Sequence, residues 1–170
     1  MFKVAPPRST ANCRGNISDG RAISLYTVPN AERSGALARA VASLYTHQIR
    51  ELDAPPSEQE VLDFIEEDVG LDSTLAVGLL DPDQLASFGV IDLLAGSISH
   101  LAVAPELESS GAGRLTLRHL ERLAIRAGRD TIYLRSLARA VDFYKKRGYR
   151  LDPTSADDRS DRVNLRKHLY

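Results

Sequence analysis

The clearest binding feature of this sequence is a run of small side chains between a strand-like stretch and a helix-like stretch. The run consists of Ser109, Ser110, Gly111, Ala112 and Gly113. A helix that begins at such a turn leaves several backbone N–H groups without partners, and small side chains let a ligand approach them closely. The helix dipole favours negative charge at the same place, so the pattern predicts a phosphate site. Tight packing of the strand against the helix would also explain these residues.

The residues around this run exclude two common nucleotide sites. No Gly-Lys-Ser or Gly-Lys-Thr follows the glycines, so the run is not a Walker loop with a magnesium site. The spacing also differs from Gly-x-Gly-x-x-Gly, which argues against a nicotinamide or flavin site. The anion that this turn would bind therefore has to be inferred from other parts of the chain.

Polar and titratable side chains occur in and before the apolar strand expected over 98–103. Asp92 lies in a neighbouring apolar strand, where a carboxylate needs a partner or marks an edge or a bulge. Ser97, Ser99 and His100 lie on the expected strand or directly before it. Because side chains alternate along a strand, His100 is expected on the face opposite Ser97 and Ser99, unless a bulge turns it. A histidine on that face would be covered by a helix or belong to the core.

The elements that position these residues alternate between strands and helices. Apolar and alternating patterns predict strands over 21–28, 74–80, 85–94, 98–103, 131–134, 149–151 and 162–169. Helices are expected over 31–52, 58–69, 114–127 and 137–147, with Ser136 as the N-cap of the last one. Ser57 and Glu60 form a capping-box pattern at the start of the second helix. This order predicts an α/β fold with a mixed sheet.

Length and composition indicate one globular domain over 21–170, after a loose N-terminal arm over 1–20. Of the 170 residues, 43% are hydrophobic and 26% are charged, which is typical of a folded protein. The formal net charge of −1 gives no overall basic field, so nucleic acid is not an expected partner. The single cysteine, Cys13, excludes an intrachain disulfide and a cysteine-rich zinc site. No apolar run reaches the roughly 20 residues of a membrane span and no signal peptide is recognisable, so the expected location is cytoplasmic.

A second motif lies further along the chain. Residues 140–149 read Ala-Val-Asp-Phe-Tyr-Lys-Lys-Arg-Gly-Tyr, and residues 101–106, before the run, read Leu-Ala-Val-Ala-Pro-Glu. With these motifs the sequence resembles the GNAT-type N-acetyltransferases, strongly over 98–151 and only in topology before that. The family's loop is usually written Gln/Arg-x-x-Gly-x-Gly/Ala; here Gly111 and Gly113 match, and Glu108 stands at the first position. The family commonly has asparagine where this chain has Leu137. The resemblance implies a mixed, mostly antiparallel central sheet flanked by helices on both faces.

The resemblance also implies acetyl-CoA as the acyl donor, without a metal ion. The backbone of Leu101 and Val103, with Ala102 between them, would pair with the pantetheine arm like an added strand. Ala140 and Phe143 would belong to the same cofactor site. The N–H groups that would hold the diphosphate are by position those of Ser109, Gly111, Ala112, Gly113 and Arg114, and Ser110 would belong to the same cofactor site. A carboxylate would oppose the diphosphate, so the side chain of Glu108 is expected to face solvent.

The implied reaction needs a base for the amine and a hydrogen-bond donor for the departing thiolate. A primary amine with a pKa near about 10.4 is almost wholly protonated at neutral pH, so a base or a water chain must take its proton. Ser97 and Ser99 fall where several family members place such groups and could position a water molecule; Asp92 and His100 are the nearby titratable candidates. Tyr144 would donate a hydrogen bond to the thiolate, and core packing is the alternative role for this tyrosine.

The implied function is transfer of an acetyl group to a primary amine of a small molecule or peptide, by direct attack in a ternary complex. A catalytically silent acyl-CoA-binding sensor or interaction module of the same fold stays open, because Glu108 and Leu137 depart from the family pattern and no base is obvious. A second copy of the chain, in a homodimer, is the other possible partner. An acidic helix would suit a cationic acceptor, although a solvated helix face explains it as well; its acidic residues are Glu58, Glu60, Asp63, Glu66, Glu67 and Asp68.

Overall fold

A twisted, nine-stranded sheet forms the centre of the part of the chain that the computed structural model describes, namely residues 2–9, 11–29, 32–33, 35–50, 54–70, 73–80, 83–154 and 162–170. The strands are β1 (Phe2–Lys3), β2 (Cys13–Asn16), β3 (Ala22–Val28), β4 (Thr74–Leu80), β5 (Gln84–Asp92), β6 (Ser97–Val103), β7 (Thr131–Leu137), β8 (Arg150–Leu151) and β9 (Arg162–His168). Their order is β2-β3-β4-β5-β6-β7-β9-β8, and β1 pairs with one end of β5. All of these pairs are antiparallel except β6–β7, which is parallel.

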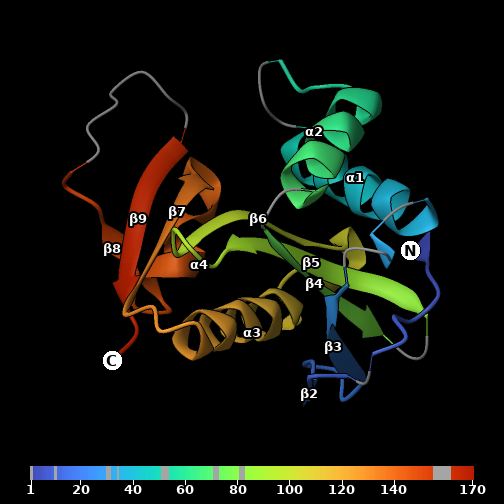
Figure 1. The fold of residues 1–170 in the computed structure, drawn as a ribbon, viewed down its shortest axis with the longest axis horizontal. Coiled ribbons are helices and arrows are strands. Elements are labelled where there is room, and N and C mark those ends of the chain that lie inside the picture. Colours follow the sequence, from blue (N-terminus) through green and yellow to red (C-terminus); the bar gives the residue numbers. More distant parts are fainter. Residues whose placement is uncertain are drawn as a thin grey trace.

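Helices cover both faces of this sheet. They are α1 (Ala36–Ile49), α2 (Glu58–Gly70), α3 (Ala112–Arg126) and α4 (Val141–Lys145), with short 3-10 helices η2 (Pro105–Leu107) and η3 (Ala138–Ala140). α1 and α2 lie on one face, whereas α3 lies on the other (Figure 1). This arrangement confirms the fold class expected from the sequence, a mixed and mostly antiparallel sheet between helices. Among the described helices, none has both the length and the apolar character that crossing a bilayer requires.

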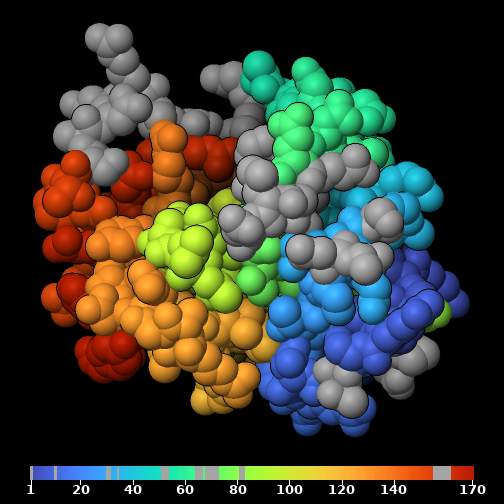
Figure 2. Space-filling model, viewed as in Figure 1, coloured from blue at the N-terminus to red at the C-terminus, as the bar shows by residue number. Residues whose placement is uncertain are grey.

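The central strands are buried on both sides. Every residue of β4 after Thr74 is buried, and so is every residue of β5 between its two ends, which explains their nearly continuous apolar sequences. Phe88 and Val90 belong to a core cluster with Leu44 of α1, and Ile91 belongs to a second cluster with Leu120 of α3. The space-filling view shows the N-terminal residues, in blue, and the C-terminal residues, in orange and red, at opposite ends of the molecule (Figure 2).

Two irregularities of β6 create the space for a site. Only Ser97 and Ile98 pair with β7, so the two strands separate beyond Ile98. The pairing of β6 with β5 also shifts its register, so that Val90 lies opposite His100 and Ile91 opposite Ile98, with Ser99 as the extra residue between them. Such a β-bulge re-aims the residues that follow it. The edge of β6 after the bulge therefore faces the gap between the strands rather than β7.

The N-terminal segment and the last helix differ from the sequence-based expectations. Within the expected N-terminal arm, the structure places β1 and β2. The helix expected over 137–147 with Ser136 as its N-cap is wrong in its start: β7 continues to Leu137, Ser136 lies in that strand, and its Oγ donates to the Leu137 carbonyl at 2.8 Å. Pairing of β7 with β9 explains the extension, because it is a long-range contact that local patterns do not reveal.

The other element boundaries differ less. The helix expected over 31–52 is observed as α1 from Ala36 to Ile49, while residues 31, 34 and 51–53 lie outside the described residues. β5 ends at Asp92 instead of residue 94, because a turn begins there. The capping box is confirmed: Ser57 N–H donates to Glu60 Oε2 at 2.7 Å, and Glu60 N–H donates to Ser57 Oγ at 3.3 Å. The hydrogen bonds that the Ser57 N–H and the Ser57 hydroxyl donate to Glu60 Oε2 lower the pKa of this carboxyl below its usual value.

Candidate active site

The turn before α3 holds its backbone in a conformation that exposes N–H groups. Ser109 and Gly111 both have positive φ angles, of 63° and 98°, with Ser110 between them. Left-handed residues beside right-handed ones make a concave arrangement of N–H groups that binds anions. A positive φ is also costly for serine, and such strain concentrates at functional sites. The turn is therefore shaped as an anion cradle rather than as a neutral connection.

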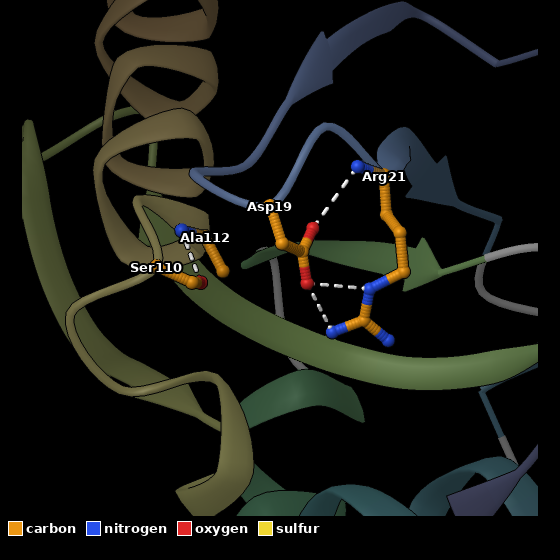
Figure 3. Close-up of polar contacts among 4 residues, drawn as sticks. All are labelled: Asp19, Arg21, Ser110 and Ala112. Carbon is orange, nitrogen blue, oxygen red and sulfur yellow. Dashed lines mark hydrogen bonds and ion pairs between the residues drawn. The ribbon is translucent and has the colours of Figure 1, made fainter.

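Most donors of this cradle are not used by the protein. Within the described part of the chain, the N–H groups of Ser109, Gly111, Gly113 and Arg114 donate to no other residue. The N–H of Ala112 makes only a long contact of 3.3 Å with Ser110 Oγ (Figure 3). Four open donors at the N-terminus of a 15-residue helix match what a phosphate requires.

The hairpin between β2 and β3 supports the cradle from outside. Ser18 N–H donates to the Ser110 carbonyl at 2.8 Å, which anchors the turn without using its donors. Asp19 lies nearby but turns its carboxylate toward Arg21, with contacts of 2.7 Å to Nε and 2.6 Å to a terminal guanidinium nitrogen (Figure 3). These hydrogen bonds to Arg21 lower the pKa of Asp19. The one acidic group of the hairpin turn is thus neutralised locally and does not repel an anion in the cradle.

The cradle opens into a long cleft, here named the donor cleft, between β6, α3, α4 and the end of α1. Glu108 stands at its rim with an exposed side chain, as expected. Ala102 and Ala112 are buried and do not line it. The sequence-predicted residues that do line it are Leu101, Val103, Ser109, Ser110, Gly111, Gly113, Arg114, Ala140, Phe143 and Tyr144.

Close packing fixes the walls of the donor cleft. A Cβ atom on Gly113 would lie 3.1 Å from Val103 Cγ2 and 3.5 Å from the Phe143 ring. Glycine at this position therefore lets α3, β6 and α4 converge at the cradle. A larger side chain would push these three elements apart.

Cationic side chains surround the same cleft. Arg114, Arg139, Lys146 and Arg147 all line it. The guanidinium of Arg147 stacks over the Phe143 ring at 3.7 Å, and its Nε atom is buried without a hydrogen-bond partner among the described residues. Burial, together with the neighbouring Arg114, lowers the pKa of Arg147. An anion in the cleft would satisfy the buried Nε and relieve the repulsion between the two arginines.

The exposed edge of β6 forms the inner wall of the donor cleft. After the bulge, the Leu101 carbonyl and the Val103 N–H point into the gap between β6 and β7. Both are bound by one side chain, because Gln48 Nε2 donates to the Leu101 carbonyl at 3.3 Å and Val103 N–H donates to Gln48 Oε1 at 3.2 Å. These are the two residues whose backbone was expected to pair with an extended ligand.

Tyr144 lies where the donor cleft meets a smaller pocket, here named the acceptor pocket. Its side chain is 8% exposed and packs edge-on against the rings of Phe143 and Tyr149, with centroid distances of 5.0 and 5.5 Å. Burial, and then the neighbouring Tyr45, raises the pKa of Tyr144 well above its usual range. The hydroxyl therefore stays protonated and can act as a hydrogen-bond donor.

His100 lines the acceptor pocket together with Ser99 and Tyr45. Its ring lies 4.8 Å from that of Tyr45 of α1, edge to face, and its Nδ1 is 3.0 Å from Ser99 Oγ. Ile98, two residues earlier, packs in the opposite cluster with α3. The bulge at Ser99, which the expectation named as its exception, turns His100 from the face that alternation predicts to the α1 face. There the histidine is 3% exposed and covered by a helix, as expected.

Two other sequence-predicted residues lie apart from both cavities. Asp92 Oδ1 accepts the N–H groups of Leu94 and Ala95 at 2.8 and 2.9 Å, so its carboxylate caps the turn between β5 and β6. Ser97 pairs with Asp92 across the strands and lines neither the donor cleft nor the acceptor pocket. The structure thus brings Ser99, His100 and Tyr144 together and leaves Asp92 and Ser97 outside.

The acidic helix has structural contacts of its own. Glu58 accepts a hydrogen bond from Ser43 of α1 at 2.6 Å, and Glu60 caps α2. The side chains of Glu66 and Asp68 lie outside the described residues. Within the described residues, no group of three histidine, cysteine or acidic side chains could hold a metal ion.

Comparison with known proteins agrees with this geometry. A family model described as an acetyltransferase (GNAT) domain matches residues 46–167. This chain belongs to the GNAT acetyltransferase family. No protein with a curated description matches the sequence.

Solved structures of GNAT proteins share the fold at low sequence identity. The PaiA N-acetyltransferase of Thermoplasma acidophilum, solved with coenzyme A, is 16% identical with a TM-score of 0.65, covering 86% of this chain and 98% of its own. A GNAT protein of Desulfovibrio desulfuricans is 15% identical with a TM-score of 0.64, and the match covers 87% of this chain and 99% of that protein. YncA of Salmonella typhimurium, solved with acetyl-CoA, is 14% identical with a TM-score of 0.61, and the match covers 87% of this chain and 94% of YncA.

Within this GNAT domain, Gln48 is a site residue that no sequence motif indicates, and Arg147 is one for which the basic stretch over 145–147 leaves open an outer phosphate or a solvated turn. Gln48 follows Val41, Leu44 and Tyr45 on the apolar side of α1, so a polar residue in an apolar stripe was the available signal. Arg147 was visible only as part of a basic stretch, and its stacking on Phe143 depends on the turn of α4. Neither contact could be derived without knowing that α1 and α4 meet at β6.

Proposed function

We propose that this GNAT protein is an acetyl-CoA-dependent N-acetyltransferase that acts on a primary amine of a small molecule or peptide. One observation carries the proposal: the open N–H groups of the cradle belong to a cleft that Tyr144 also lines. The fit of a diphosphate is supported by the buried, unpartnered Nε of Arg147. Charge-assisted hydrogen bonds contribute roughly 1.5–3 kcal/mol each, so a few of them would dominate the affinity for the cofactor.

The remaining length of the donor would follow the edge of β6. The Leu101 carbonyl and the Val103 N–H provide an acceptor and a donor in strand geometry, which suits the amide groups of a pantetheine arm. Ala140 and Phe143 would pack along the opposite wall. This placement brings the thioester to the junction of the donor cleft and the acceptor pocket.

The chemistry then depends on three side chains at that junction. Acetyl-CoA, when bound, supplies a thioester that an amine in the acceptor pocket can attack. Ser99 and His100 would hold a water molecule that takes the proton of the amine, because an ammonium group cannot act as a nucleophile. Tyr144 would donate a hydrogen bond to the departing sulfur. Proton transfer from the tyrosine is uphill, because its raised pKa exceeds that of a thiol near about 8.5.

The binding part of the proposal is tested with coenzyme A and a matched pair of glycine variants. Coenzyme A at about 100 times its Kd should add about 2.7 kcal/mol to the free energy of unfolding and raise the Tm. Gly111→Val should lower the affinity at least tenfold, because a side chain at φ 98° distorts the cradle. Gly128→Val imposes similar strain at φ 77°, at the other end of α3, and should leave the affinity unchanged.

The catalytic part is tested by release of free thiol from acetyl-CoA with a panel of amines, from polyamines and amino sugars to peptides. An active amine identifies the acceptor. Binding of acetyl-CoA without thiol release for any amine would favour the silent sensor, and no Tm shift at millimolar coenzyme A would refute the site. We also expect a cytoplasmic location and a homodimer, and gel filtration tests the second expectation.

A further inference from the structure

Gln48 spans the gap between the two separating strands of the sheet. Its side chain binds the Leu101 carbonyl and the Val103 N–H of β6. Its own backbone carbonyl accepts a hydrogen bond from the guanidinium of Arg139, which belongs to η3 directly after β7. The last turn of α1 is thus attached to both sides of the gap. Gln48 also lines both the donor cleft and the acceptor pocket, so it stands on the boundary between them.

The side-chain amide of Gln48 imitates a ligand. A carboxamide has one carbonyl acceptor and an N–H donor group, the same pair that a backbone or pantetheine amide presents. In the free protein this amide satisfies the strand edge as an added strand would. Two amides cannot bind the same carbonyl and N–H in the same direction, so an extended ligand must displace the side chain. No other described side chain donates to the Leu101 carbonyl or accepts from the Val103 N–H.

We propose that Gln48 is a displaceable gate, which occupies the donor-binding edge of β6 in the free protein and yields it to the amide of the acyl donor. The inference rests on the proposed function, because it takes acyl-CoA as the ligand of that edge. Entry of the donor moves Gln48 off the boundary and joins the donor cleft to the acceptor pocket. Gln48 acts through the strand edge, so it is a positioning residue and not a catalytic one.

The affinity for coenzyme A tests the competition. Gln48→Ala removes the amide, and Gln48→Met keeps the length of the side chain without hydrogen-bonding groups. Because neither variant has to give up two hydrogen bonds, both should bind coenzyme A more tightly than the wild type, on the order of tenfold by calorimetry. Thr46→Val is the matched control: it alters the same turn of α1, where Thr46 Oγ1 donates only to the Ala42 carbonyl, and should bind like the wild type. Equal or weaker binding by both Gln48 variants overturns the inference.

Amide hydrogen exchange tests the contact without any ligand. In the wild type, Gln48 Oε1 protects the Val103 N–H; in Gln48→Ala and Gln48→Met this amide should exchange at least several-fold faster, while that of Ala104, bonded to the Ala86 carbonyl, should not change. Unchanged exchange at Val103 overturns the inference even if affinities differ. If the wild type binds coenzyme A but the Gln48 variants do not give the expected result in either test, only the gate is refuted. If no form binds coenzyme A, the proposed function fails as well.

Discussion

Tyr144 shows how burial limits what a single side chain can do. Its ring is held edge-on by Phe143 and Tyr149, and the residue lines both cavities where they meet. Burial raises its pKa, which makes it a poor source of a free proton and a stable hydrogen-bond donor. The position of this residue could be predicted from the Phe-Tyr motif alone, because the motif and the fold of α4 are local.

Removal of the hydroxyl should separate turnover from binding. In Tyr144→Phe we expect kcat to fall about 10- to 100-fold, because one hydrogen bond to a charged sulfur is lost and such a bond contributes roughly 1.5–3 kcal/mol. The Kd for coenzyme A should stay within about twofold, because phenylalanine keeps the ring contacts. Tyr133→Phe removes a hydroxyl from an exposed tyrosine of β7 and is the control. Equal losses of kcat and affinity in Tyr144→Phe would instead indicate a packing role.

The bulge in β6 has the largest consequences of any single element feature. It turns His100 toward α1 and presents the Leu101 and Val103 backbone to the gap. A bulge depends on the register with β5, and that register is fixed by contacts far apart in sequence. Simple alternation therefore predicted the wrong face for His100, although the strand itself was predicted. The loop before α3 was predictable because glycine and serine specify a turn locally.

α3 carries a second histidine that links three elements. His119 is 3% exposed; its Nδ1 lies 3.9 Å from Cys13 Sγ of β2 and its Nε2 lies 3.3 Å from Thr27 Oγ1 of β3. Burial lowers its pKa from 6.5 to about 4, and Arg126 and Arg122 add to the effect. The folded protein therefore holds this histidine neutral at pH values where the unfolded chain binds a proton.

This difference predicts an acid-sensitive stability. Between about pH 6.5 and 4 the unfolded state binds more protons than the folded state, so the free energy of unfolding falls as the pH is lowered through this window. Above it, the contribution of His119 to stability is fully present. His119→Gln should remove about 1–2 kcal/mol of the decrease, measured by urea unfolding at several pH values. Parallel curves for wild type and variant would show that His119 does not carry the effect.

At the scale of the whole molecule, the sheet consists of two parts that are joined by few backbone pairings. β6 and β7 share only two residue pairs, and their separation creates the donor cleft and the acceptor pocket. Other contacts must hold the parts together without filling that gap. Sequence patterns predicted the elements on each side, but these contacts join residues far apart in the chain and could not be assigned.

Glu121 of α3 provides one such contact. Its Oε1 accepts a hydrogen bond at 3.1 Å from the hydroxyl of Tyr149, which follows α4. The same oxygen forms an ion pair at 2.9 Å with Lys167 of β9. The Glu121 and Lys167 side chains are only 15% and 23% exposed, so removing one strands the other in a poorly solvated place. Burial raises the pKa of Tyr149, and the Glu121 carboxylate raises it further.

Glu121→Ala should therefore lower the free energy of unfolding by about 2–3 kcal/mol, measured by urea denaturation, because an ammonium and a hydroxyl lose their shared acceptor. Lys3→Ala removes a pair of 3.9 Å whose lysine is 75% exposed, and should cost less than about 0.5 kcal/mol. A double-mutant cycle with Lys167→Ala isolates the coupling. Additive losses would mean that the ion pair between Glu121 and Lys167 contributes nothing across the gap.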